Sequence, residues 1–316
     1  RRLSHTRQGQ RNFRSRSSLT KNRDFIKNIN KTVLYLSGSF FVLTFSKPFT
    51  MKKILFLFLI TVTILTFNSC ETEQPWQPLF NGENLDNWDK YLGTPLRGFD
   101  SLAQLASVEN VFSVIEENGE KIIQISGEVN GSLATRESFS DYHLQLVFKW
   151  GETVYTTRNS GLLYHSFGDF GAAIGTWMVN IECQLKHENL GDTYLMNNTY
   201  CETAVGEEDG RFIFTKDGEV KKFGKEFNGA GIKKAVDAEN PLGEWNTVEL
   251  YSVGGTTVHV VNGQVTMVNN NTGKVENGEV IPLTGGKIQL QSEGGDMFVK
   301  SIQVKPIKEI PKEFLK

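Results

Sequence analysis

Glu182 and Gln184 are the two residues whose types and spacing most clearly permit chemistry. They lie in the segment 177–185, where apolar and polar residues alternate. Alternation with a period of two predicts a strand with one buried face, and residues two apart on a strand share a face. A carboxylate and an amide placed together can hold sugar hydroxyls, and the carboxylate can act as an acid or a base. From the pattern alone, a solvated outer face is the simpler interpretation.

A second polar cluster precedes this strand and surrounds Gly161. An Asn-Ser-Gly sequence at the start of a strand often only shapes a turn, whereas an arginine, a tyrosine and a histidine can line a cleft. In the loop after the Glu182 strand, a histidine and an aspartate could bind a cation, although loops commonly collect such residues. The residues of these two groups are Arg158, Asn159, Ser160, Tyr164 and His165, and then His187 and Asp192.

The elements that must position these residues are almost all strands. Alternation also marks 142–150, and Asn-Gly and Asp-Gly pairs, among them Asn118-Gly119 and Asn262-Gly263, favour tight hairpins. Many short strands with glycine-rich turns predict an all-β sandwich or jelly roll in one domain, with a short helix at 101–108 and an irregular segment at 206–242. The other predicted strands are 111–115, 121–126, 160–165, 211–215, 245–252, 256–261, 264–268, 287–291 and 297–304.

The first part of the chain differs from the rest. Residues 1–50 contain eleven Lys and Arg residues and one acid, and we interpret them as a non-native upstream segment. Met51 then begins a basic start, an apolar run to Phe67 that is too short to span a bilayer, and a small residue before Cys70. This pattern resembles a lipoprotein signal peptide at 51–69, which would make Cys70 a lipidated N-terminus. A simple secretory signal is the alternative.

Charge and cysteine content limit the partners of the remaining chain. Residues 70–316 carry 21 basic and 35 acidic side chains and no basic run, so a nucleic acid is not an expected partner. No Cys/His spacing indicates a zinc site. In an oxidising compartment Cys183 and Cys201 could pair, and a buried free thiol is the alternative.

A series of short motifs in this order resembles the 3-keto-disaccharide hydrolase family, common in Bacteroidota, over about 78–307. The individual motifs are common, but their order and spacing are specific. They are Leu79 to Trp88, Leu133 to Glu137, Asn159 to His165, Glu182-Cys183-Gln184 with Gly191-Asp192, Gly243 to Asn246, Val261 to Gly263, and Ile288 to Gly294. The resemblance implies a concanavalin-like jelly roll at 78–307, between a linker at 70–77 and a tail at 308–316.

The resemblance also implies an enzyme that acts on glycosides oxidised at C3, and it places Glu182 and Gln184 in a functional strand. We hypothesise that Glu182 removes the C2 proton, so that the group at C1 leaves and water then adds. In this hypothesis Arg158, His165 or a possible divalent cation polarises the ketone. The substrate-binding residues are then Gln184, Asn159, Ser160 and Tyr164, with His187 and Asp192 in the following loop.

Two other functions remain open at this stage. Ordinary glycoside hydrolysis requires two carboxylates, and the sequence shows only one persuasive acid. A non-catalytic carbohydrate-binding module of the cell envelope is the alternative from another class, because one fold can serve both. The expected partner is an oligosaccharide or glycoside. The expected location is the cell envelope, on either face of the outer membrane, with the membrane contacted only through the lipid.

Overall fold

The computed structural model describes residues 31–36, 39–44 and 74–315 of the 316-residue chain. The chain divides into two units, Arg1–Thr72 and Glu73–Lys316. Cys70, the predicted signal peptide and most of the predicted upstream segment lie outside the described residues. Among the described residues, no helix is long and apolar enough to span a membrane.

In the first unit, the structure describes one antiparallel hairpin. Its strands are β1 (Lys31–Leu36) and β2 (Ser39–Thr44), with Lys31 opposite Thr44. Both strands are rich in β-branched and aromatic residues, which favour extended backbone.

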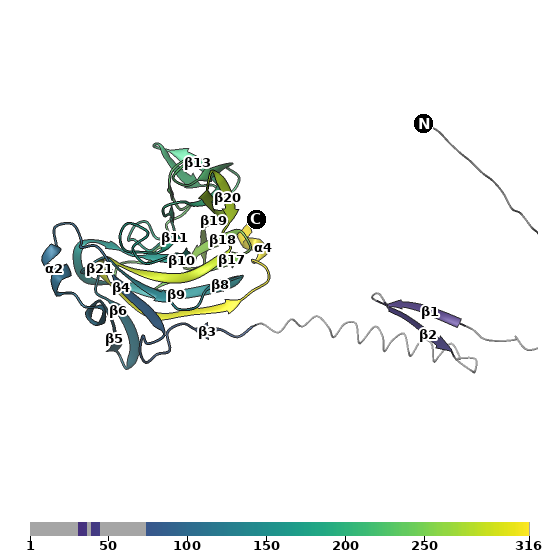
Figure 1. Cartoon of the computed structure of the whole chain (residues 1–316), viewed down its shortest axis with the longest axis horizontal. Helices are drawn as coiled ribbons and strands as arrows, with labels where there is room; N and C mark the ends of the chain where they lie inside the picture. Colours follow the sequence, from purple (N-terminus) through teal and green to yellow (C-terminus); the bar gives the residue numbers. More distant parts are fainter. Residues whose placement is uncertain (1–30, 37–38, 45–73, 316) are drawn as a thin grey trace, which may run out of the picture. The chain divides into compact units, whose positions relative to one another are not determined.

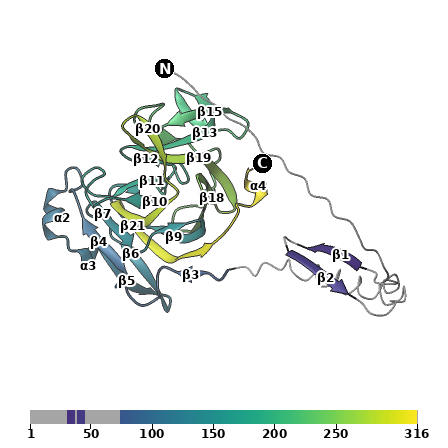
Figure 2. The same ribbon diagram turned by 45° about the vertical axis from the view of Figure 1, so that its right-hand side comes forward.

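The second unit is a sandwich of two antiparallel sheets, and the predicted all-β jelly-roll class is confirmed (Figures 1 and 2). Sheet 1 carries Glu182. Its strands follow one another in the order β4, β7, the first half of β21, β10, β11, β12 and β16. Their bounds are β4 (Trp88–Leu92), β7 (Gly131–Thr135), β10 (Gly161–Phe167), β11 (Val179–Gln184), β12 (Thr193–Leu195), β16 (Gly231–Ile232) and β21 (Gly285–Pro306).

Sheet 2 faces sheet 1 across the core. Its strands run in the order β5, β6, the second half of β21, β9, β17, β18 and β19. Two short strands, β3 and β8, also pair with β21. The bounds are β3 (Gln77–Pro78), β5 (Phe112–Glu117), β6 (Glu120–Ile125), β8 (Phe139–Ser140), β9 (Tyr142–Asn159), β17 (Asn246–Val253), β18 (Thr256–Val261) and β19 (Gln264–Glu276).

β21 belongs to both sheets, and the prediction of two separate strands at 287–291 and 297–304 was wrong in this respect. Residues 289–292 pair with β7 in sheet 1, and residues 297–306 pair with β9 in sheet 2. The register shifts between Glu293 and Met297, where Gly294 adopts a φ of +96°. Gly294 and Gly295 allow the strand to bend from one sheet to the other without ending.

The core lies between the two sheets and follows the alternation of the sequence. Leu144, Leu146 and Phe148 of β9 are fully buried, and so are Ile288 and Leu290 of β21. These residues belong to one continuous apolar cluster that includes side chains from both sheets. The predicted half-buried strands are confirmed by this packing.

The segment 206–242 is more regular than predicted. β13 (Thr199–Glu208) pairs with both β14 (Arg211–Phe214) and β15 (Glu219–Phe223), and its first residues pair with the end of β19. β20 (Glu279–Pro282) pairs with β19. Strands β13 and β15 therefore form an extra antiparallel layer, and only part of the predicted loop is irregular.

Local signals explain the turns and helices. Asn118, Asn262 and Asn277 have positive φ and precede glycines with positive φ, as tight hairpin turns require. The predicted helix at 101–108 is instead two short ones, because the chain is extended at Ala106 and restarts where the Ser107 side chain accepts a hydrogen bond from the backbone of Asn110. The helices are α2 (Asp100–Leu105), α3 (Val108–Val111) and α4 (Lys312–Leu315).

Candidate active site

Glu182 projects from sheet 1 on the side opposite the core. Its neighbours Ile181 and Cys183 are fully buried members of the central apolar cluster, so the alternation of β11 turns Glu182 and Gln184 to the other face. We call this face of sheet 1 the site face. Glu182 is nevertheless 2% exposed, so it is not the solvated residue that the pattern alone favoured.

The register of three strands places a small group of polar residues on the site face. Gly161 of β10 is opposite Gln184 of β11, and Leu163 is opposite both Glu182 and Gln289 of β21. Directly opposite residues of antiparallel strands share a face. The site face therefore carries Glu182 and Gln184 on one side of β10, and Gln289 and Gln291 on the other.

Gly161 makes room for two of these side chains. A Cβ atom at this position would lie 2.4 Å from Glu182 Oε1 and 2.7 Å from Gln291 Oε1. Both oxygens therefore converge over the backbone of β10, where any larger residue would displace them. Gly161 has no positive φ, so its importance is the missing side chain rather than the backbone conformation.

A second carboxylate, Glu293, lies on the same face, and the sequence analysis missed it as an acid. Glu293 is two residues after Gln291 and pairs with Asn159 at the end of β9. The Asn159 side chain donates a hydrogen bond to the Glu293 carboxylate, and the positive charge of Lys186 also stabilises it. In the sequence, Gln289, Gln291 and Glu293 alternate with the buried Ile288 and Leu290. This alternation was the signal that could have identified Glu293.

Both carboxyl groups bind protons more tightly than an ordinary glutamate. Burial raises the pKa of Glu182 well above its usual range, and the charges of Glu293 and Asp192 raise this pKa further. Burial also raises the pKa of Glu293 to about 7, against the opposing effects of Asn159 and Lys186. Perturbed, mutually repelling carboxyl groups are characteristic of functional sites.

Two amide oxygens near the carboxyl groups are buried without a hydrogen-bond partner. They are Gln291 Oε1 and Asn159 Oδ1. A buried amide oxygen without a partner is costly, and most proteins avoid it. Acceptors kept in this state beside two acids are available to a ligand that brings hydroxyl groups, as a sugar does.

Tyr164 and His165 do not lie on the site face, and the expectation that they join Glu182 was wrong. The Tyr164 hydroxyl lies 3.0 Å from Thr257 Oγ1, inside the sandwich. His165 Nε2 lies 3.5 Å from Ser252 Oγ, and burial lowers the pKa of His165 to about 3, which leaves the ring neutral. His165 has a φ of +51° at an irregularity of β10, so two successive side chains turn inward.

Arg158 and Ser160 have structural partners. The Arg158 guanidinium donates two hydrogen bonds of 3.3 Å to the carbonyl oxygen of Gly151, and its charge acts on Asp296. Ser160 is buried and donates to the carbonyl oxygen of Gln291 at 2.9 Å. The Arg158 side chain is thus bonded to backbone, and its role in polarising the ketone stays a prediction.

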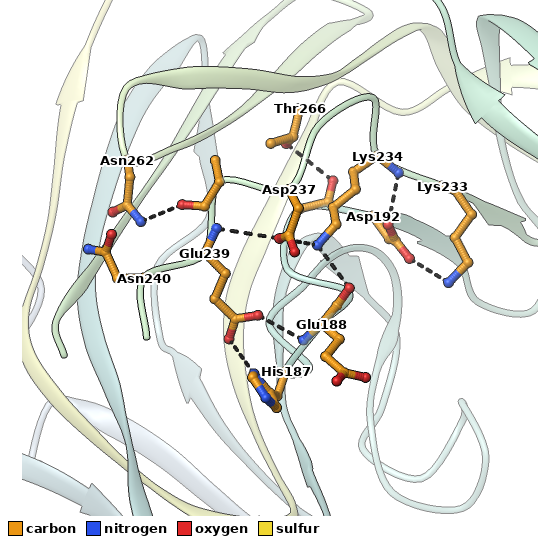
Figure 3. Close-up of polar contacts among 12 residues, drawn as sticks. His187, Glu188, Asp192, Lys233, Lys234, Asp237, Glu239, Asn240, Asn262 and Thr266 are labelled. Atoms are coloured by element: carbon orange, nitrogen blue, oxygen red, sulfur yellow. Dashed lines mark hydrogen bonds and ion pairs between the residues drawn. The ribbon is translucent and has the colours of Figure 1, made fainter. Parts of the chain in front are cut away.

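His187 and Asp192 belong to a network that fixes the turn after β11 (Figure 3). The carboxylate of Glu239 lies 3.0 Å from His187 Nδ1 and accepts a 2.7 Å hydrogen bond from the backbone N–H of Glu188. Asp192 accepts bonds of 2.8 Å from Lys233 Nζ and from the backbone N–H of Lys234.

The network joins the turn at 187–192 to the segment 233–240, which lies over it as Figure 3 shows. Lys234 Nζ adds a bond of 2.9 Å to the Glu188 carbonyl oxygen. Gln184 is also held locally, since its Oε1 accepts from the backbone N–H of Lys186 at 3.0 Å. Residues of the loop thus position the end of the Glu182 strand. Of His187 and Asp192, only Asp192 acts electrostatically on Glu182.

The structure also bears on the predicted cysteine pairing and on the possible divalent cation. Cys183 and Cys201 are both free and buried. In the part of the chain that the structure describes, no group of three or more His, Cys, Asp or Glu residues gathers as a set of metal ligands. The carboxyl pair supplies two such ligands, and His187 and Asp192 are already bonded to other side chains or to backbone.

Several solved structures are similar to this chain, each at low sequence identity. A putative glycosyl hydrolase from Parabacteroides distasonis shares 17% identity with this chain, covers 74% of it and 100% of its own length, and has a TM-score of 0.43. A carbohydrate binding module from Bacillus subtilis shares 11% identity over 61% of this chain and 91% of its own, with a TM-score of 0.37. A galectin-like protein from Bacillus subtilis shares 10% identity over 75% and 99%, with a TM-score of 0.42.

Comparison with curated proteins finds no significant match. One family model covers most of the second unit, from residue 75 to residue 305, and it contains every residue of the carboxyl site. The chain belongs to the family of 3-keto-alpha-glucoside-1,2-lyase-like domains.

Proposed function

We propose that this protein cleaves 3-keto-glycosides, including 3-keto-disaccharides, by elimination followed by hydration. The observation that carries the proposal is the pair of carboxyl groups, Glu182 and Glu293, on one face of sheet 1, where the charge of Glu293 acts on Glu182. Membership of the family supports a carbohydrate substrate.

The proposed reaction needs one base and one acid. A ketone at C3 acidifies the proton on C2, and a base removes this proton as the electron pair moves toward the C3 oxygen. The electrons then form a C1–C2 double bond, and the C1–O bond breaks with its electron pair on the leaving oxygen, which takes up the proton that the base accepted from C2. Water adds at C1 afterwards, so the net change is hydrolysis without oxidation or reduction.

The two carboxyl groups divide these tasks. Glu293 has a pKa of about 7, so near neutral pH it supplies a carboxylate that can accept the C2 proton. Burial and the charges of Glu293 and Asp192 raise the pKa of Glu182 well above its usual range, which favours its protonated form, and a protonated Glu182 can donate a hydrogen bond to the C3 oxygen as negative charge develops there. We therefore assign the base to Glu293 in place of Glu182.

Neighbouring amides orient the substrate. Asn159 is bonded to Glu293 and keeps its own buried Oδ1 without a partner, so it can accept from a sugar hydroxyl beside the base. Gln291 Oε1 and Glu182 Oε1 converge over Gly161, and because Gln291 Oε1 has no hydrogen-bond partner, a substrate can displace it without breaking a hydrogen bond there. We assign Gln291 as the side chain that moves aside when the sugar binds.

The second carboxylate also supports ordinary glycoside hydrolysis, which needs two acids that flank the scissile bond. The buried, protonated state of Glu182 fits the general acid of such an enzyme, and Glu293 fits its partner. The two functions differ in one respect, because only elimination requires the ketone. A non-catalytic sugar-binding module is the third possibility for the same face.

The substrate can be tested directly with the full chain. We expect aglycone release from a 3-keto-glucoside and none from the unoxidised parent glucoside. Equal release from both compounds would establish ordinary hydrolysis, and binding without release from either would establish a binding module. Each measurement is repeated with a chelator, since loss of release on chelation would show that a divalent cation takes part.

We also propose that Cys70 is lipidated and that the protein works in the cell envelope. The support is the basic and apolar sequence before Cys70. When the full chain is expressed in bacteria with a labelled fatty acid, we expect label in the wild-type protein and none in Cys70→Ser. Equal labelling of both proteins would contradict the proposal.

A further inference from the structure

Lys186 is a cation beside the carboxyl pair that the reaction described above does not use. It follows β11 by two residues, and the strand pairing continues past the end of β11 to include it. The backbone N–H groups of the residues on either side of Lys186 donate to the carbonyl oxygens of the residues on either side of Asn159, at 2.9 and 3.0 Å. Lys186 is therefore directly opposite Asn159, and opposite residues of antiparallel strands share a face.

Asn159 lies between Lys186 and the proposed base, Glu293. Its side chain donates a hydrogen bond to the Glu293 carboxylate on the other neighbouring strand. Burial raises the pKa of Glu293, and the charge of Lys186 acts in the opposite direction. Lys186, Asn159 and Glu293 thus form one row across the site face. Glu182 lies four residues before Lys186, which is about 13 Å along an extended chain, so Lys186 lies at the Glu293 end of the site.

The Lys186 ammonium group is available to a ligand. No hydrogen bond or ion pair of this side chain is recorded among the residues that the structure describes, whereas Lys233 and Lys234 at the same turn are each paired with an aspartate. The backbone of Lys186 is fixed, because its N–H donates to Gln184 Oε1 and its carbonyl oxygen accepts from Asn189. A cation on a fixed backbone can stabilise negative charge that develops on a substrate.

The order of atoms in the substrate matches the order of these groups. In the proposed reaction the C3 oxygen lies at Glu182, and C2 gives its proton to Glu293. C1 is the other ring neighbour of C2, so the leaving oxygen on C1 lies on the side of the base that is away from Glu182. The register places Lys186 at this end of the site.

We infer that Lys186 is a further catalytic residue, whose ammonium group stabilises the negative charge on the leaving oxygen as the C1–O bond breaks. The inference rests on the proposed function. Lys186 keeps its own proton, and the leaving oxygen ends as a hydroxyl group with the proton that Glu293 took from C2. The stabilisation matters most for a simple alcohol, whose oxyanion is unstable, and least for a nitrophenol, whose ring spreads the charge.

The test compares two leaving groups in the full chain at pH 8.5, where Glu293, with a pKa of about 7, is a carboxylate. The substrates are methyl 3-keto-glucoside and 4-nitrophenyl 3-keto-glucoside, and the rate without protein is subtracted. We expect Lys186→Met to lower kcat for the methyl compound by about 10²-fold and to leave kcat for the nitrophenyl compound within about 3-fold. Lys186→Gln also removes the charge and should give the same pattern.

Two further variants are the controls. Lys186→Arg keeps the positive charge and should retain most of the activity on both compounds. Lys216→Met removes a lysine from an exposed turn after β14 and should change neither rate. The melting temperatures of the Lys186 variants should equal that of the wild-type protein, because no other side chain in the described part of the chain depends on the ammonium group for a hydrogen bond.

Equal losses on both compounds, or no loss on the methyl compound, would overturn the inference and leave the proposed function standing, because the wild-type protein still cleaves the keto compounds. Equal losses would show that Lys186 acts through Glu293, whose carboxylate both substrates need. If the wild-type protein cleaves neither compound, the proposed function fails, and the inference fails with it.

Discussion

Replacing Glu293 with glutamine is expected to lower turnover of a 3-keto-glucoside by about 10²–10⁴-fold, the usual contribution of a general base. The amide keeps the size of the side chain and can still bond to Asn159, so the fold should persist. In the wild-type protein, activity should fall as the pH drops below about 7, because the Glu293 carboxylate then becomes protonated. Turnover measured between pH 5 and pH 9 tests both expectations.

The same substitution is expected to stabilise the protein at alkaline pH. The folded-state pKa of Glu293 is raised to about 7, so its stabilising contribution is complete below the ordinary glutamate pKa of 4.5 and is lost as the pH rises through 7. At pH 8 a neutral glutamine removes this penalty, by about 1–3 kcal/mol at 1.36 kcal/mol per pKa unit and some solvent screening. At pH 4 the two proteins should have similar free energies of unfolding.

Urea denaturation at both pH values measures this difference, and Glu188→Gln provides a matched control. Glu188 is exposed in the turn after β11 and contacts its neighbours through backbone atoms. Its replacement should change neither activity nor the pH dependence of stability. A Glu293→Gln protein that keeps its activity near pH 7 would exclude Glu293 as the base and would return that role to Glu182.

Gly161→Ala is the second substitution with a large expected effect, and it should separate activity from stability. The new methyl group would meet Glu182 Oε1 and Gln291 Oε1, which are the free ends of flexible side chains. Such ends can move, so the free energy of unfolding should fall by only about 1–3 kcal/mol. The displaced carboxyl group of Glu182 is nevertheless the proposed hydrogen-bond donor to the C3 oxygen, and a displacement of about 1 Å at a reacting group can cost about 10²-fold in rate.

The control for this substitution is another strand glycine without a positive φ. Gly206 of β13 meets the condition, since a Cβ there would lie 3.1 Å from the side-chain oxygen of Thr215 and away from the carboxyl pair. We expect Gly206→Ala to leave kcat/KM unchanged. A Gly161→Ala protein with full activity and an ordinary melting temperature would show that the oxygens over β10 do not take part in the reaction.

Much of the fold could be predicted because alternation is a local signal. The strands at 142–150, 177–185 and 256–261 show one apolar face, and the structure buries that face in each. Asn-Gly pairs at 118 and 262 predicted tight turns because few other residues adopt positive φ at low cost. Strands β7 and β13 were missed. In the case of β7, the strand is buried throughout, so its residues do not alternate.

The site was harder to predict because it depends on register between distant strands. The pairing of Asn159 with Glu293 joins residues from β9 and β21, and no spacing along the chain reveals it. His165 was misplaced for a different reason, since a single positive φ reverses the face on which its side chain lies. Alternation singled out Glu182 as a candidate but favoured a solvated face, because alternation gives the face and not the burial; the resemblance placed Glu182 in a functional strand.

The course of β21 has a consequence for the order in which the protein becomes functional. Its residues complete both sheets, because they pair with β7 and β10 in one and with β6 and β9 in the other. During synthesis all of these partner strands are made first, and their edges remain unpaired until β21 is made. Unpaired strand edges are prone to aggregate. The same late strand brings Glu293. A ribosome that stops before residue 285 therefore releases a chain that has neither a closed core nor Glu293.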